Sequence, residues 1–296
     1  MTMKSVIDIM KERTSFSFEV FPPKMEQPIK PLLSCLNELY KFNPDFISCT
    51  YGAGGTNSGR NTEICKSIID HGHIAVTHFT CIGNTKETIR AELAACLANG
   101  VNHILALRGD LPAGWEGTRG DFKYANELVA FIRAEFGGRF TIAMAGAPEK
   151  HIQCPTDAED IAHLKIKQDA GADFIMTQLC YDIEQFKRWM EQIRKAGITI
   201  PVDVGVMPVL TKESTLRMAL SMNGCSIPRK LSEIISRYYN APEDFMKAGI
   251  EYTIMQMNQF MGEGVNGLHL YTLNRSAAVE QILGKSGLRA KTEPLK

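Results

Sequence analysis

The chain has 296 residues, of which 44% are hydrophobic, and its 33 Lys and Arg residues balance its 33 Asp and Glu residues. A formal net charge of zero argues against a generic polyanion-binding surface, so we expect neither nucleic acid nor a membrane as a partner. A chain of this length buries roughly three quarters of its unfolded surface, which suffices for one large core. No Pro-, Gly- or Ser-rich linker interrupts the sequence, and we predict a single domain over residues 1–296.

Two features of the sequence predict a cytoplasmic protein. Residues 1–13 carry several charges and no unbroken apolar run, which predicts a short helical extension rather than a signal peptide or a membrane span. The cysteines include no Cys-x-x-Cys pair and mostly fall in apolar patterns, as is typical of reduced core residues. They are Cys35, Cys49, Cys65, Cys81, Cys96, Cys154, Cys180 and Cys225.

Eight short runs of β-type residues recur along the chain, and the stretches between them have the spacing of amphipathic helices. Glycine repeatedly stands between a helical stretch and the next run, where it can end the helix. This alternation is typical of strand–helix units and a parallel sheet. The predicted strands are 15–21, 45–51, 75–81, 103–109, 141–147, 174–179, 201–207 and 267–273.

Eight such units in a chain of this length predict an α/β fold of the (β/α)₈, or TIM-barrel, type. A doubly wound sheet stays open as an alternative, because periodicity does not show closure. The seventh connection, from Pro208 to Gly264, is unusually long. We predict that it holds extra helices around 214–222, 230–239 and 242–261.

Polar or ionisable residues stand near the ends of six of the eight predicted strands. The six groups are Glu19 on the first strand, Thr50, His78, Arg108-Gly109-Asp110, Thr177-Gln178 and the segment Tyr271 to Arg275 on the last. In a TIM barrel the carboxyl ends of the strands form the rim at which active sites lie. The sequence therefore predicts an active site at this rim.

The rim residues differ in how strongly each one indicates function. Glu19 lies inside an apolar run, where burial is expected to raise its pKa and suit it to act as an acid. Gln178 is expected to contact a ligand, because a buried amide needs partners. His78 alone is more typical of a hydrogen-bonded core histidine, and Thr50 is ordinary in a strand.

Searches for cofactor motifs mostly fail. The glycine-rich segment 52–59 fits neither the dinucleotide fingerprint nor a P-loop, and we interpret it either as a mobile active-site loop or as a simple surface loop. Gly284-Lys285-Ser286 lacks the upstream glycine of a P-loop. Since no His-Glu-x-x-His motif or paired Cys/His spacing occurs, we predict no metal site.

Several motifs together resemble methylenetetrahydrofolate reductases, in order and in spacing, over nearly the whole chain. They are Ser17–Lys24, Thr50–Ala53, His78–Cys81, Ala106–Pro112, Thr177-Gln178 and Leu270–Arg275. The resemblance is to the short bacterial form, a catalytic barrel without the C-terminal regulatory domain of eukaryotic relatives. It implies a flavoprotein with non-covalent FAD that uses NADH or NADPH to reduce 5,10-methylenetetrahydrofolate to 5-methyltetrahydrofolate, which feeds methyl groups to methionine synthesis.

The resemblance also implies roles for single residues. Glu19 matches the general acid that helps to open the five-membered folate ring, and Asp110 matches a catalytic carboxylate near the pterin and the flavin. Both would contact the substrate, as would Gln178 and Leu273. The matched cofactor-binding residues are Thr50, His78, Arg108, Gly109, Asp110, Ala147, His151, Asp160, His163 and Lys167.

One helix and three departures from the family pattern bear on cofactor binding. The resemblance aligns Asp160, His163 and Lys167 with residues that hold the ribose and phosphates of FAD. Lys165 and Lys167 are read as one basic stripe that suits a pyrophosphate, although without the resemblance this stripe would be a solvated helix face. Three positions depart from the family pattern: Ala147, where relatives usually have tyrosine; Ile166, where they have a charge; and Lys212, where an aromatic residue sometimes stands. These three departures leave open how tightly the chain binds flavin and whether it uses NADH or NADPH.

Three functions stay open at this point. The first is the folate reductase, for which we also expect a homo-oligomer. The second is a barrel enzyme that uses the same rim without flavin, such as a pterin-dependent methyltransferase. The third is a flavin-poor subunit of a larger redox assembly. Absorbance in the flavin bands would separate the first from the other two.

Overall fold

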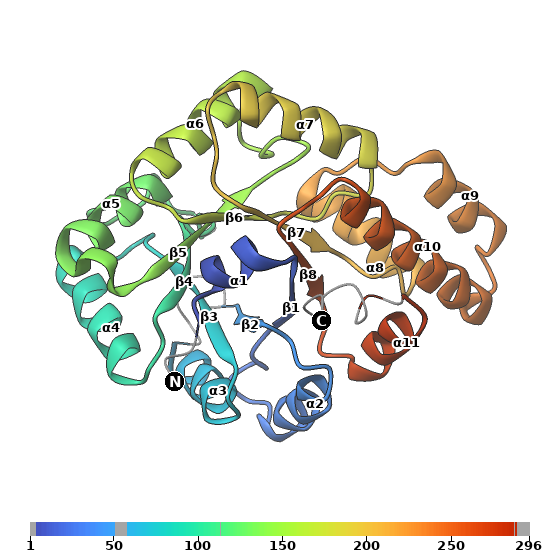
Figure 1. Ribbon diagram of the computed structural model, residues 1–296, viewed down its shortest axis with the longest axis horizontal. Helices are drawn as coiled ribbons and strands as arrows, with labels where there is room; N and C mark the ends of the chain where they lie inside the picture. The colour runs from blue at the N-terminus through green and yellow to red at the C-terminus, as the bar shows by residue number, and fades with distance from the viewer. Residues whose placement is uncertain (1–3, 51–57, 113, 287, 289–296) are drawn as a thin grey trace.

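The computed structural model describes residues 4–50, 58–112, 114–286 and 288, and within them eight parallel strands close into a barrel (Figure 1). Each strand pairs with the next in sequence, and the barrel closes where β1 pairs with β8. The predicted TIM barrel is confirmed, and the doubly wound alternative is wrong because of this last pairing. The strands are β1 Ser15–Val20, β2 Phe46–Cys49, β3 Ile74–Thr80, β4 His103–Leu107, β5 Thr141–Gly146, β6 Phe174–Thr177, β7 Val202–Val206 and β8 Gly267–Tyr271.

Each observed strand ends one or two residues before its predicted end. β8, for example, ends at Tyr271, because Leu273 and Asn274 have φ angles of 51° and 54° and leave the extended conformation. Apolar character continues into these loops, so the sequence pattern does not show where pairing stops. The glycine-rich segment predicted as a loop over 52–59 lies outside the described residues, except for its last two positions, which begin α3.

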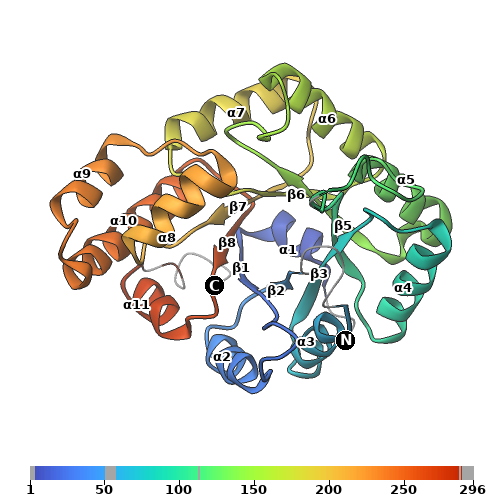
Figure 2. The ribbon, with the colours of Figure 1, turned by 180° about the vertical axis from the view of Figure 1, so that it is seen from behind.

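Helices surround the barrel (Figure 2). They cover the outward-facing side chains of the strands. Residues at alternate strand positions, such as Phe18, point outward and pack against helix residues such as Leu36 and Ile68. Gly171, with a φ of 110°, ends one of these helices, and a side chain there would press on Arg133. The surrounding helices are α2 Lys30–Tyr40, α3 Ser58–Asp70, α4 Lys86–Ala98, α5 Ala125–Phe136 followed by the 3₁₀ turn Gly137–Arg139, α6 Asp157–Asp169, α7 Ile183–Lys195, α10 Pro242–Gly262 and α11 Ser276–Ser286.

The predicted amino-terminal helix is α1, Val6–Glu12, and it closes the barrel at the amino-terminal ends of the strands. Its Val6 and Met10 are buried against inward-facing residues such as Phe46 and Phe174. A capping box formed by Ser5 and Asp8 starts the helix. Because α1 seals one end of the barrel with apolar side chains, the opposite end is left for polar chemistry.

The predicted elaboration between β7 and β8 is confirmed. It contains α8 Lys212–Leu216, the π-helical turn Arg217–Asn223, α9 Arg229–Arg237 and α10. Gly249 lets α10 approach closely, because a Cβ atom there would overlap the carbonyl oxygen of Val209. Val209 N also donates a hydrogen bond to Thr253 Oγ1 on α10, at 3.0 Å. These contacts fix the extra helices beside the rim.

Two further properties of the described residues bear on function. All eight cysteines are free, and all but Cys96 are buried, as expected for core thiols. No helix in the described ranges has the length and apolar character needed to cross a membrane.

Candidate active site

The carboxyl ends of the parallel strands bring the predicted rim residues to one end of the barrel. Glu19 lies near the end of β1 and His78 near the end of β3, and both side chains point inward. Thr50 follows β2 directly, and Arg108 follows β4. The predicted concentration of polar groups at this end of the barrel is therefore present in the structure.

Glu19 stands between two histidines at the centre of the barrel. Its Oε2 atom lies 3.3 Å from His78 Nε2 and 3.7 Å from His269 Nε2. The Glu19 side chain is 18% exposed, whereas that of His269 is 1% exposed. The carboxylate can thus meet a ligand from the rim while its other contacts are inside the protein.

The pKa of Glu19 does not follow the sequence-based expectation. Burial favours the protonated form and would raise this pKa, but the interactions with His269 and His78 outweigh burial and hold it at about 2. Burial also lowers the pKa of His269, so this imidazole is neutral near pH 7 and acts on Glu19 as an N–H donor. The expectation of a raised pKa was wrong because the two histidines belong to strands far from Glu19 in sequence.

His269 is a buried site residue that the sequence analysis missed. Its Nδ1 atom lies 2.6 Å from Ser17 Oγ, and its Nε2 atom lies 3.1 Å from Ser48 Oγ. The sequence did carry a signal, since a histidine in the apolar run Gly267–Tyr271 stands two positions before Tyr271 and so shares its face of the strand. A polar side chain at such a position needs partners inside the barrel.

The loop after β4 packs closely against the end of β3 at Gly109. Gly109 has a φ of 92°, and a Cβ atom there would lie 2.7 Å from Ile82 Cγ2. Asp110 is exposed at the rim, and Arg108 donates a hydrogen bond to Gln153 Oε1, at 2.8 Å. Thr80 lies against Gly109, and its buried hydroxyl has no hydrogen-bond partner among the described residues. A ligand with polar edges would complement this part of the rim.

A second cluster lies where the loop after β5 meets α6. Lys167 Nζ donates to the carbonyl oxygen of Ala145, at 2.7 Å, and burial lowers its pKa to about 8. Burial raises the pKa of Asp160, while Lys167, among other neighbours, opposes this change. His151 and His163 are exposed nearby, with His163 Nδ1 3.9 Å from Cys154 Sγ. The predicted FAD-binding residues of this region thus gather in one place.

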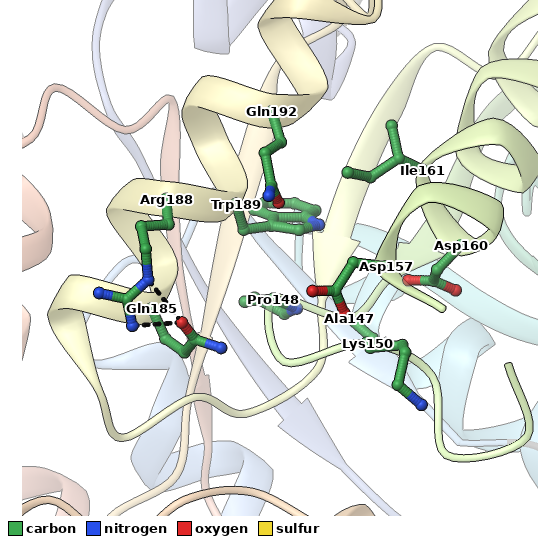
Figure 3. Close-up of a pocket in the computed structure, with 10 residues that line it drawn as sticks. All are labelled: Ala147, Pro148, Lys150, Asp157, Asp160, Ile161, Gln185, Arg188, Trp189 and Gln192. Atoms are coloured by element: carbon green, nitrogen blue, oxygen red, sulfur yellow. Dashed lines mark hydrogen bonds between the residues drawn. The ribbon is translucent and has the colours of Figure 1, made fainter. Parts of the chain in front are cut away.

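A cavity of about 120 Å³ opens between this loop, α6 and α7 (Figure 3). Two predicted cofactor-binding residues, Ala147 and Asp160, line it, and Trp189 of α7 forms part of its wall. Arg188 donates to Gln185 Oε1, at 2.7 Å, on the α7 side. The space beside Ala147 is therefore open rather than filled by a neighbouring side chain.

The sequence matches the family model described as methylenetetrahydrofolate reductase over residues 2–287. The chain belongs to this family. It is 32% identical over 274 residues to the 5,10-methylenetetrahydrofolate reductase of Escherichia coli, covering 92% of this chain and 90% of that protein. It is 35% identical over 282 residues to methylenetetrahydrofolate reductase 1 of Schizosaccharomyces pombe, covering 94% of this chain and 47% of that protein. The chain thus spans about half the length of the first eukaryotic relatives and nearly all of the bacterial one.

A solved structure supports the fold of this reductase-family chain. It has a TM-score of 0.65 and 14% sequence identity, and it covers 96% of each chain. That structure is described as an uncharacterized protein from Clostridium thermocellum that binds two copies of 5-methyl-5,6,7,8-tetrahydrofolic acid. At this identity the likeness concerns the fold alone.

The structure corrects two further expectations for this member of the methylenetetrahydrofolate reductase family. Gln178 is exposed, so the argument from a buried amide was wrong, although its position at the rim stands. Lys165 pairs with Asp169, whereas Lys167 turns inward, so the two lysines form no common stripe. The reason is geometric, since residues two apart on a helix point in nearly opposite directions.

The remaining predicted positions are also placed by the structure. Leu273, matched to a folate contact, is partly buried at the end of β8. Lys212 lies over the ring of Tyr239, with Nζ 3.5 Å from the ring centroid, and Ile166 is 49% exposed on α6. Within the described residues, no group of three or more His, Cys, Asp or Glu side chains is placed to hold a metal ion.

Proposed function

We propose that this chain reduces 5,10-methylenetetrahydrofolate to 5-methyltetrahydrofolate with FAD and with NADH or NADPH. The observation that carries the proposal is the partly exposed Glu19 carboxylate at the centre of the rim, held by His78 and His269 in a chain of the reductase family. Ring opening of the substrate needs a proton at the departing nitrogen, and Glu19 is placed to give it.

The residues around the rim fit a flavin. The buried hydroxyl of Thr80 has no hydrogen-bond partner among the described residues, so it can serve a bound group. Gly109 packs directly against Thr80, in a position where any side chain would overlap Ile82. Thr50, His78, Arg108, Gly109 and Asp110 would hold the ring system, and Ala147, His151, Asp160, His163 and Lys167 the remainder of FAD.

The chemistry then divides between cofactor and protein. Bound FAD would carry hydride from the nicotinamide to the folate. Glu19 would donate a proton to the nitrogen that leaves the methylene bridge, so that one C–N bond breaks as the N–H bond forms. Asp110, Gln178 and Leu273 would position the pterin. Because the pKa of Glu19 is about 2 in the free protein, Glu19 must gain a proton before it can act.

The test separates the two half-reactions in the stopped-flow spectrometer. Glu19→Gln keeps the shape of the side chain and removes the acid. We expect flavin reduction by NADH or NADPH to stay within about tenfold of normal, while flavin reoxidation by methylenetetrahydrofolate falls by a factor on the order of 10²–10⁴. Asp110→Asn serves as the comparison and is expected to slow both half-reactions moderately.

Two results would contradict the proposal. If Glu19→Gln slows both half-reactions equally, or neither, Glu19 is not the acid. If the purified protein takes up no flavin, a barrel enzyme that works without flavin or a flavin-poor subunit becomes the better account. Mass spectrometry of the chromophore released by heat checks the cofactor itself, and finding FMN instead of FAD would remove the role given to Asp160 and His163.

A further inference from the structure

A column of polar side chains runs through one side of the barrel interior, from β7 to the rim. It begins at Asp203, whose side chain is fully buried, with Oδ2 3.4 Å from Ser17 Oγ and 4.0 Å from His269 Nδ1. It continues from Ser17 to His269 Nδ1, at 2.6 Å, and His269 Nε2 then lies 3.1 Å from Ser48 Oγ and 3.7 Å from Glu19 Oε2. The opposite side of the interior is apolar, with residues such as Leu105. The proposed mechanism above gives Asp203 no task.

The surroundings of Asp203 favour a neutral carboxylic acid. Its Oδ1 atom and the hydroxyl of Ser15 have no hydrogen-bond partner among the described residues, and both lie so close to Gly267 that a Cβ atom there would overlap them. An ionised carboxylate in this position would be poorly compensated. Burial raises the pKa of Asp203 well above its usual value.

The charged and titratable neighbours of Asp203 do not reverse this preference. From β8 comes His269, which is itself neutral, and Tyr271, whose pKa is raised by burial. Before β2 stands Asp45, whose charge disfavours a second carboxylate, although Asp45 is paired with Arg13 at 2.5 and 2.7 Å. The adjacent residue on β6 is Met176, which carries no charge. No cation therefore faces Asp203 among the described residues.

A protonated Asp203 gives the column a direction. Its hydroxyl can donate to Ser17 Oγ, and the Ser17 hydroxyl can then donate to His269 Nδ1. With Nδ1 as an acceptor, the neutral imidazole carries its hydrogen on Nε2, which faces both Ser48 Oγ and the Glu19 carboxylate. Asp203 thereby fixes the tautomer of His269 that suits the carboxylate.

We propose that Asp203 is a positioning residue that stores a proton for Glu19 and delivers it through Ser17 and His269. In the transfer, the Asp203 O–H bond breaks as a new Ser17 O–H bond forms. The former Ser17 hydroxyl hydrogen moves to His269 Nδ1, and the His269 Nε2 hydrogen moves to Glu19. One proton leaves Asp203 and one arrives at Glu19, with no change in electrons.

This inference rests on the proposed function, because it supplies the proton that Glu19 lacks in the free protein. Folate lying over Glu19 would exclude water and favour its protonated form, which draws the proton up the column. After Glu19 has given the proton to the substrate, it takes another from solvent at its exposed edge. The column then shifts back and Asp203 regains its proton.

The first test is infrared spectroscopy of the full-length holoprotein near pH 7. The unaltered protein should show the carbonyl stretch of a neutral carboxylic acid that Asp203→Asn lacks. The readout does not depend on turnover, and a merely structural role would not produce it. If the two spectra agree in this region, Asp203 is ionised and the inference is wrong.

The second test is the pH dependence of flavin reoxidation by methylenetetrahydrofolate. We expect Asp203→Asn to slow this half-reaction by about tenfold to a hundredfold, which is less than the rate loss caused by removing a general acid. The same variant should leave flavin reduction by NADH or NADPH unchanged. The rate in the variant should fall about tenfold per pH unit over the neutral range, because Glu19 must take each proton from solvent, while the unaltered protein stays level until Asp203 ionises.

Two matched variants distinguish loss of the relay from simple misfolding. Ser17→Ala leaves Asp203 in place but breaks the column, and it should reproduce the same loss and the same pH slope. Ser15→Ala alters the same layer of the barrel beside Asp203 without touching the column, and it should behave normally. Normal rates of flavin reoxidation by methylenetetrahydrofolate in both Asp203→Asn and Ser17→Ala would overturn the relay. If the unaltered protein does not reduce methylenetetrahydrofolate at all, both the proposed function and the relay are refuted.

Discussion

Replacing Glu19 by glutamine should destabilise the protein, although Glu19 is the proposed acid of the candidate active site. The pKa of Glu19 falls from the usual 4.5 to about 2 in the folded protein, and each pKa unit corresponds to about 1.4 kcal/mol. The carboxylate form is thus favoured by about 3 kcal/mol, and with 18% of the side chain exposed, solvent screens little of this. Glutamine mimics the protonated form, so we expect Glu19→Gln to lower the free energy of unfolding by about 3 kcal/mol at pH 7.

The pH dependence gives the sign of the effect. Because the folded pKa lies below the unfolded value, the stabilisation by Glu19 is fully present above pH 4.5 and is lost as the pH falls toward 2. Urea unfolding at pH 7 and at pH 5 should therefore show the same difference between the two proteins, and the difference should shrink at pH 4 and below.

The control for this prediction is an exposed glutamate. Glu12→Gln alters an exposed pair with Lys4 and should change stability by less than about 0.5 kcal/mol. If Glu19→Gln is as stable as the unaltered protein, or more stable, the histidines do not outweigh burial. The pKa of Glu19 would then be raised, as the sequence alone indicated.

Three further predictions concern residues that are proposed to hold the flavin. Gly109→Ala places a Cβ atom 2.7 Å from Ile82 Cγ2 at a φ of 92°. Urea unfolding should therefore show a free energy of unfolding lower by about 1–3 kcal/mol. An unchanged unfolding midpoint would mean that the loop adjusts to the added methyl group without strain. Lys167→Met should speed flavin loss on dilution, while Lys165→Met should not, and equal effects of the two variants would rule out this assignment. In the unaltered protein, flavin retention should weaken as the pH rises through about 8, where Lys167 loses its charge. Ala147→Tyr should slow flavin loss by filling the space beside the loop, and equal or faster loss would count against it.

The fold was predictable because its signals are local and repeated. Each apolar run followed by a helical stretch contributes one unit, and the eight units leave few ways to arrange a parallel sheet. The position of Glu19, His78 and Arg108 at one rim follows from the same rule, since parallel strands bring their carboxyl ends together. The proposal that Glu19 is the general acid required the family resemblance as well.

The sequence does not show the environment that distant strands create around a side chain. The pKa of Glu19 depends on His269, 250 positions later in the chain, and on its distances across the barrel. The exposure of Gln178 and the inward turn of Lys167 depend on where a strand or a helix face happens to end. Asp203 drew no attention in the sequence, because a lone aspartate in a short strand shows its burial only after the barrel has closed.

The pairing of β1 with β8 brings the first and last strands of the barrel together at the candidate active site. Glu19 and Ser17 come from the first strand of the barrel and His269 from the last, so the contact between Ser17 and His269 joins residues 252 positions apart. Contacts with such a long sequence separation close a large loop, and the entropy cost of that closure favours their formation after the more local contacts. Nascent or nicked chains that have assembled only some of the strands will therefore hold no charge-stabilised Glu19. Recovery of the folate half-reaction during refolding should consequently report the joining of the two chain ends, later than any signal from helix content.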